Sequence, residues 1–218
     1  MGLCSSINVL MVDNPLDDTK KTPQPQTAEA LRSMVEKYCK GSKKSYGEPN
    51  TWNVTLVTDM DELFKNMDQF NAPIDQWNTS EVTTMNGMFQ GASSFNQPIT
   101  MDTSQVTDMC QMFDGASSFN QPITMDTSQV TDMRFMFSGA SSFNQQITMD
   151  TSQVTMMAGM FKDASSFNQL ITMDTSKVTN MSCMFDGATA MIYSVPSLKE
   201  SAGEKKERLS QDAAAVSN

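Results

Sequence analysis

Apolar residues recur through the middle of the chain with a period of 24 residues. A Met-Phe pair stands at 88–89, 112–113, 136–137, 160–161 and 184–185, and a second Phe follows six residues after the first four of these pairs. A unit this short cannot bury its apolar side alone. The pattern therefore predicts units that stack on one another and share one core.

Two periodicities are visible inside each unit. Ile99 and Met101 alternate with the polar Thr100, which predicts a short parallel strand with Thr100 pointing outward. Further along, the stretch 109–113 carries apolar residues at i, i+3 and i+4, the spacing of one helix face. Gly115 is expected to end this helix in a left-handed conformation. Each unit is thus predicted to be a strand, a turn, one or two helical turns and a tight return.

Stacking in register predicts columns of identical side chains. One inward-pointing aromatic column is expected from Phe95, Phe119, Phe143 and Phe167. An Asn recurs at the return into each strand, and a structural ladder that satisfies backbone groups is preferred there to a binding role. Its members are Asn71, Asn96, Asn120, Asn144 and Asn168.

The two ends of the chain depart from the repeat. Leu31, Met34, Val35 and Tyr38 lie on one face at helical spacing, so the segment 27–51 is predicted to cap the first unit. A proline-containing segment at 1–26 is expected to be flexible, and the Ser-, Lys-, Glu- and Ala-rich segment at 194–218 is expected to be a disordered charged tail. The repeats occupy 52–193.

The predicted fold class follows from these patterns. We expect an α/β solenoid, a leucine-rich-repeat-like stack of 24-residue coils, each a short parallel strand plus a short helix, with an N-terminal capping helix. The offsets of Ile99, Met101, Ser104 and Val106 match those of the leucine-rich-repeat pattern.

The repeat motif itself resembles a known family. The stretch 106–123 reads Val-Thr-Asp-Met-Cys-Gln-Met-Phe-Asp-Gly-Ala-Ser-Ser-Phe-Asn-Gln-Pro-Ile, and 130–147 is nearly the same. It resembles BspA-like leucine-rich-repeat surface proteins of the DUF285 repeat family, over about residues 27–190. The resemblance implies surface display or protein binding without enzyme activity, in proteins that are often secreted or lipid-anchored. The chain departs from the family in having Met101 and its later equivalents where Trp52 and Trp77 stand.

Composition narrows the possible functions. The chain has no histidine and a net charge of −10. Because an acidic surface repels phosphate groups, nucleic acid is not expected as a partner. No nucleophile with a base partner and no phosphate-binding loop is visible, so we expect neither catalysis nor a cofactor. The four cysteines show no metal-binding spacing, and no metal site is predicted.

The N-terminal sequence Met-Gly-Leu-Cys-Ser-Ser matches the pattern for N-myristoylation at Gly2, with Cys4 beside it as a candidate for palmitoylation. Two acyl chains would give stable anchoring to the cytoplasmic face of a membrane. An N-terminus without acyl groups is an equally weighted alternative. The cell surface or the extracellular space is the alternative location that the family resemblance implies.

The outward face of the predicted strands is the expected binding surface for a protein or a glycan. Its carboxylates could collect a cation such as calcium, although a simply solvated polar face is preferred. A structural spacer and a secreted adhesion-type surface protein remain alternatives to the binding module. The face consists of Thr100, Asp102, Thr124, Asp126, Thr148, Asp150, Thr172 and Asp174, which we call the Thr/Asp face.

Overall fold

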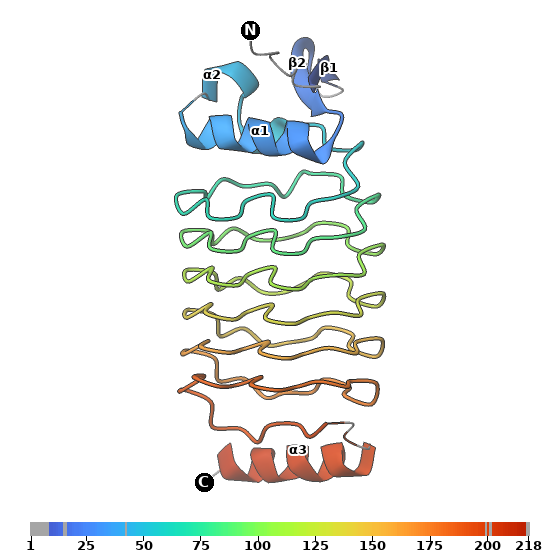
Figure 1. Ribbon diagram of the computed structural model, residues 1–218, viewed down its shortest axis with the longest axis vertical. Helices are drawn as coiled ribbons and strands as arrows, with labels where there is room; N and C mark the ends of the chain where they lie inside the picture. The colour runs from blue at the N-terminus through green and yellow to red at the C-terminus, as the bar shows by residue number, and fades with distance from the viewer. Residues whose placement is uncertain (1–8, 15–16, 42, 199, 201, 217–218) are drawn as a thin grey trace, which may run out of the picture.

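The computed structural model describes residues 9–14, 17–41, 43–198, 200 and 202–216. In Figure 1, loops of chain lie one above another along the long axis, with secondary structure gathered at the two ends. The elements are β1 (Val9–Asn14), β2 (Asp17–Pro25), α1 (Ala28–Cys39), the four-residue α2 (Lys43–Tyr46), a 3-10 helix (Pro49–Thr51) and α3 (Ala202–Val216).

Successive units are joined by backbone hydrogen bonds that run along the stack. The N–H of Phe89 donates to the carbonyl of Met112 at 2.8 Å, and the N–H of Phe113 donates to the carbonyl of Met136 at 2.8 Å. These bonds belong to a stretch that we call the turn segment, which comprises residues 84–92 in the second unit. Within it, the N–H groups of alternate residues donate to the next unit, and those of Met88, Gln90 and Ala92 close tight turns within their own unit.

The predicted helix at 109–113 is wrong. Gln111, in the middle of that stretch, has a φ of 57°, and the equivalent Phe135 has a φ of 55°. A right-handed helix cannot hold such residues, and their N–H groups donate to the next unit instead of to a helical carbonyl. Met109, Met112 and Phe113 are nevertheless all buried, because two consecutive turns place the same positions inward. Gly115 does have a positive φ, 69°, but within a turn.

The predicted strands are also wrong. The region around Ile99 has a single-residue parallel bridge to Ile123, and the longer series of parallel bridges lies in the turn segments, from Asp59 through Asp108 to Asn180. Between Trp52 and Tyr193, all described, no helix or extended strand occurs. The α/β solenoid class, with its leucine-rich-repeat-like coils of strand plus helix, is therefore incorrect. In place of the predicted strands and helices, the units consist of turns that are joined to the next unit by backbone hydrogen bonds.

Aromatic columns fill the interior of the stack. The predicted column is confirmed, because Phe95, Phe119 and Phe143 are fully buried and their neighbouring ring centroids lie 6.0–6.1 Å apart. A second column, from Phe89 onward, stacks at 5.5 Å, and the two columns contact each other at 4.0 Å between Phe113 and Phe119. The repeat thus produces one continuous core from one end of the stack to the other.

Two polar ladders accompany the aromatic columns. The predicted Asn ladder is confirmed: each Asn side-chain oxygen accepts a backbone N–H one unit later, from the next Asn in the first four, for example Asn120 from Asn144 at 2.9 Å, and from Ile192 in the last, Asn168. A second ladder, of buried Thr side chains, was not predicted from the sequence. The hydroxyl of Thr103 donates to the carbonyl of Asp126 at 2.8 Å, and Thr127 repeats this contact with Asp150. Both ladders hold the loops between turn segments in register.

The N-terminal end carries α1, where the apolar spacing predicts a helix. Thr27 caps it by accepting the N–H of Ala30, and Leu31, Met34 and Val35 are fully buried against the first unit. Within the segment expected to be flexible, residues 9–14 and 17–25 instead form the antiparallel hairpin of β1 and β2. Pro23 links this hairpin to the stack, because its carbonyl accepts the N–H of Asn53 at 2.9 Å.

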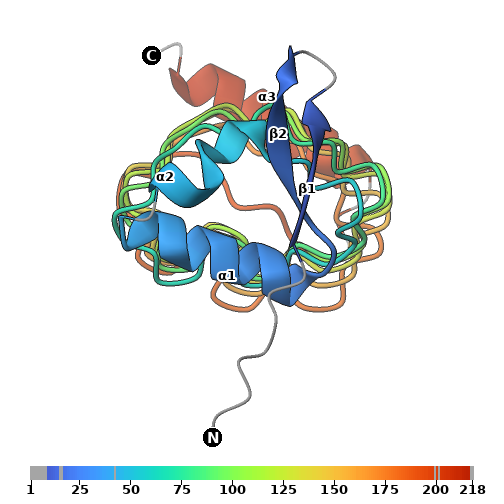
Figure 2. The same cartoon turned by 90° about the horizontal axis from the view of Figure 1, so that it is seen from above.

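The C-terminal end carries α3, where the sequence predicted a disordered tail. The helix is held by buried polar groups, because Arg208 forms a two-pronged contact with Glu200 at 2.9 and 3.1 Å. Asp212 accepts the N–H of Ser194 at 2.9 Å. The segment has little apolar surface, which is typical of disorder, but these buried polar contacts hold the helix instead. In Figure 2, α1 and α3 lie along opposite sides of the oval cross-section.

Candidate binding surfaces

The Thr/Asp face keeps the predicted orientation although no strand carries it. Thr100 is exposed, whereas its neighbours Ile99 and Met101 are buried, and the same alternation holds in the later units. The hydroxyl of Thr100 donates to the carbonyl of Asp75 at 3.3 Å, and that of Thr124 donates to Ile99 at 3.2 Å. Hydrogen bonds to the preceding unit therefore hold the first two Thr side chains of the exposed row. The exposed Thr residues are Thr100, Thr124, Thr148 and Thr172.

The aspartates of this face help to shape the chain. Asp102 accepts the N–H of Ser104 at 3.0 Å, and the same contact recurs in Asp126 with Ser128, Asp150 with Ser152 and Asp174 with Ser176. These bonds stabilise the charged form, so they hold the pKa of Asp102, Asp150 and Asp174 below the usual carboxyl value. One oxygen of each carboxylate is thus used locally; Asp102, Asp126 and Asp150 are otherwise exposed, and Asp174 is half-buried.

Among the described residues, no three carboxylates of this face lie close enough together to have metal-ligand spacing. The group of side chains with metal-ligand spacing lies in the turn segments instead, and comprises Asp108, Cys110 and Asp132. The guanidinium of Arg134 already pairs with Asp132 at 2.6 Å, and burial raises the pKa of the Cys110 thiol to about 11. A neutral thiol beside an occupied carboxylate is a poor ligand set.

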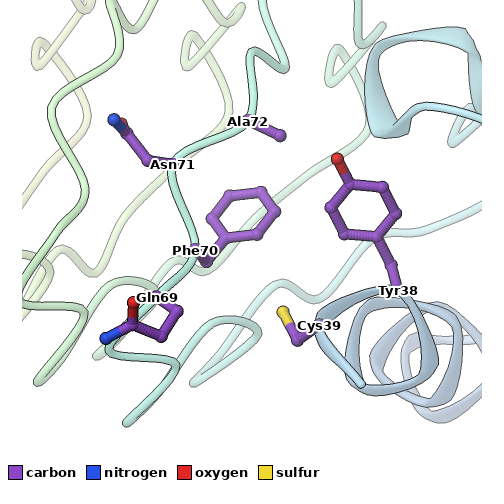
Figure 3. A pocket seen from close by; sticks show the side chains of 6 residues that line it. All are labelled: Tyr38, Cys39, Gln69, Phe70, Asn71 and Ala72. Atoms are coloured by element: carbon purple, nitrogen blue, oxygen red, sulfur yellow. The ribbon is translucent and has the colours of Figure 1, made fainter. Parts of the chain in front are cut away.

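A pocket between α1 and the first unit was not foreseen from the sequence. It has a volume of about 270 Å³, and Figure 3 shows Tyr38 and Cys39 of α1 on one side of it and the ring of Phe70 on the other. Tyr38 donates its hydroxyl to Glu48 at 2.7 Å; burial, reinforced by this bond, raises its pKa to about 12. A second hollow of about 210 Å³ shares Cys39 and Gln69. The periodic sequence pattern could not predict these two cavities, because they lie where α1 meets the irregular first unit.

The proposed acylation residues, Gly2 and Cys4, lie outside the described residues. Within the part of the chain that the structure describes, no helix has the length and apolar character needed to cross a bilayer. Cys39, Cys110 and Cys183 are free thiols.

Comparison with known proteins gives a family and nothing closer. Neither a curated protein nor a solved structure matches the chain. A family model matches it twice in succession, over residues 29–125 and 124–218, and so covers α1, the repeats and α3. The chain therefore belongs to the family described as "Mycoplasma protein of unknown function, DUF285".

Proposed function

We propose that the chain is a non-catalytic repeat protein that binds another protein or a glycan through the Thr/Asp face. One observation carries the proposal: one outward Thr per unit, from Thr100 to Thr172, is exposed on a backbone that neighbouring units hold in place. A surface that is already ordered loses little conformational entropy on binding, which favours affinity. The partly free carboxylates of Asp102 and its equivalents add hydrogen-bond acceptors beside the Thr row.

The test compares two double variants of the full chain. Thr124→Arg with Thr148→Arg places bulky cations in the middle of the Thr/Asp face, and Gln105→Arg with Gln129→Arg adds the same charge at exposed turns of two neighbouring units. We expect a partner captured by the unmodified chain to be lost by the first variant and retained by the second. Equal capture by both variants would remove the Thr/Asp face from consideration.

A structural spacer is the second candidate function, favoured by the acidic excess of the repeats, which carry 15 acidic and 4 basic residues between 51 and 193. Sedimentation of the unmodified chain separates the two functions. A binding module stays monomeric over a wide concentration range, whereas an assembly element associates as concentration rises.

We further propose that acylation at Gly2 and Cys4 tethers the chain to the cytoplasmic face of a membrane. The support is the match of the first six residues to the myristoylation pattern. The intact mass of the protein from its native source tests this directly. A myristoyl increment, with or without palmitate, is expected, and a glycan increment would instead place the protein at the cell surface or outside the cell.

A further inference from the structure

The last turn segment has a row of backbone N–H groups that the stack leaves open. In the preceding unit, four alternate N–H groups donate to carbonyls of the last unit at 2.7–2.9 Å. Their counterparts one unit later have no acceptor anywhere in the described residues. The satisfied donors are Met157, Gly159, Phe161 and Asp163, and the open donors are Met181, Cys183, Phe185 and Gly187.

All four open donors point the same way because of the local backbone. Cys183 and Gly187 have φ values of 57° and 76°, and between them Met184 and Asp186 close turns by donating to the carbonyls of Met181 and Cys183. Alternation of right- and left-handed residues turns successive N–H groups to one edge and carbonyls to the other. The row is therefore an edge of donors, unlike a β-strand edge, which offers donors and acceptors in turn.

The C-terminal helix does not close this edge. The segment leading into α3 covers the other side of the last unit, where the N–H of Glu200 donates to the buried Thr175 hydroxyl at 3.0 Å. Cys183 and Gly187 are exposed, and Phe185 is only half-buried. The Phe185 ring stacks on Phe161 at 5.4 Å and, within the described residues, has no aromatic neighbour on its far side.

The opposite end of the stack is closed in the matching place. There the turn segment of the first unit presents carbonyls outward, and α1 lies over it. The guanidinium of Arg32 in α1 donates to the carbonyl of Asp61. A cation on the carbonyl edge complements the aligned peptide dipoles of the stack, as it does at the C-terminus of a helix. The N–H row at the other end of the stack has the opposite polarity. Among the described residues, no side chain or helix covers it as Arg32 and α1 cover the carbonyl edge.

We propose that the open N–H row binds a repeat-like segment of a second polypeptide, which adds one further turn segment to the stack. The occupant must supply four alternate carbonyls, the chemistry that fills the equivalent row in every earlier unit. It must also place apolar side chains over Phe185. Two C-terminal ends cannot satisfy each other, since both present donors only, so a symmetric end-to-end pair is excluded. This edge is separate from the Thr/Asp face and does not depend on its role.

A peptide of this chain's own sequence serves as the probe. Residues 83–92, Thr-Thr-Met-Asn-Gly-Met-Phe-Gln-Gly-Ala, contain the carbonyls that fill the row of the first unit. In the free full-length chain we expect the amides of Cys183 and Phe185 to exchange with solvent much faster than those of Gly159 and Phe161. Saturating peptide should slow exchange at Cys183 and Phe185 and leave Gly159 unchanged. A peptide of the same composition in scrambled order is the control.

A matched pair of modified proteins tests the location. With Cys4 and Cys39 replaced by Ser, N-ethylmaleimide modifies the exposed Cys183 in the row, and with Cys4 and Cys183 replaced it modifies the exposed Cys39 at the other end. We expect modification at Cys183 to weaken peptide binding about tenfold or more, and modification at Cys39 to leave it unchanged. Amides at Cys183 and Phe185 that are already protected in the free chain would overturn the proposal. So would equal binding of the scrambled peptide, or binding that survives modification of Cys183.

Discussion

A helix covers each end of the stack, in part at the C-terminal end, and the two helices use different chemistry. At the N-terminal end, α1 buries Leu31 and Met34 completely against aromatic and aliphatic side chains of the first unit. At the C-terminal end, α3 buries Arg208 and Asp212, which are 7% and 3% exposed. An apolar contact is tolerant of small losses, whereas a buried ionic contact depends on every member being present. The two caps should therefore fail in different ways.

The largest expected effect is at the ionic cap. Replacing Arg208 with Ala leaves the carboxylates of Glu200 and Asp212 buried without their cation, and loss of one partner of a buried pair costs about 3–5 kcal/mol. We expect this loss in the free energy of opening of α3, measured by native-state hydrogen exchange of its amides. Lys206→Ala, on the exposed face of the same helix, should change it by less than about 0.5 kcal/mol.

An unchanged exchange rate in α3 of the Arg208→Ala variant would show that the ionic group does not hold the helix. In the described structure, Oδ2 of Asp212 is buried without a hydrogen-bond partner. It lies 3.6 Å from a guanidinium nitrogen of Arg208, so removal of Arg208 should affect it strongly. That carboxylate relies on the nearby charge of Arg208, so the loss should not be screened by added salt.

Truncation in the apolar cap comes second. Met34→Ala removes a fully buried side chain from α1 and should cost about 2–5 kcal/mol in the free energy of unfolding measured with urea. The loss is graded, because neighbouring side chains can close part of the cavity. Glu36→Ala, at an exposed position of the same helix, is the control. A loss at Met34 no larger than that at Glu36 would contradict an apolar anchor for α1.

The contrast between the caps explains what the sequence could and could not predict at the ends. The segment 28–39 shows its buried face as apolar residues at helical spacing, so its helix could be predicted. The segment 202–216 has no such face, and its buried residues are charged ones that composition assigns to solvent. Their partners Glu200 and Ser194 lie outside the helix, and pairing with residues outside an element leaves no periodic signal within it.

Within the repeats, the burial pattern was predictable and the backbone was not. The residues at 109, 112, 113 and 119 are buried as expected, because the period of the repeat decides which side chains face the core. The same spacing fits a helix face and a pair of turns. Hydrogen bonds between units decide in favour of turns, and they became visible only with the neighbouring unit in place. The Thr/Asp face was placed correctly on the surface for the same reason of periodicity.

A smaller effect is expected from the helix cap of α1. Thr27 accepts the N–H of Ala30 at 3.2 Å, and its replacement by Ala should cost about 1 kcal/mol of stability. Thr27→Ser, which keeps the hydroxyl, should restore most of this loss in the same urea titration. A Ser variant as unstable as the Ala variant would show that the Thr methyl group, and not the hydroxyl bond, stabilises this end.

The smallest expected effect is a pH dependence of the stability of the N-terminal cap, through Tyr38 of α1. Burial and the bond to Glu48 raise the pKa of Tyr38 to about 12, above the value of about 10 in an unfolded chain. The folded state holds this proton longer than the unfolded state. The contribution of Tyr38 is therefore complete below about pH 10 and is lost as pH rises through about 12.

Tyrosinate absorbance of the full chain measures this titration. The chain has three tyrosines, so the difference between the unmodified chain and Tyr38→Phe isolates Tyr38. We expect the isolated curve to have a midpoint near 12, and alkaline unfolding of α1 to begin at lower pH than in the Phe variant, which has no proton to lose. A midpoint near 10 would mean that Tyr38 is solvated and that the pocket of Figure 3 is open to water down to its hydroxyl. The helix α3, which has no tyrosine, should keep its amide protection independently of this change.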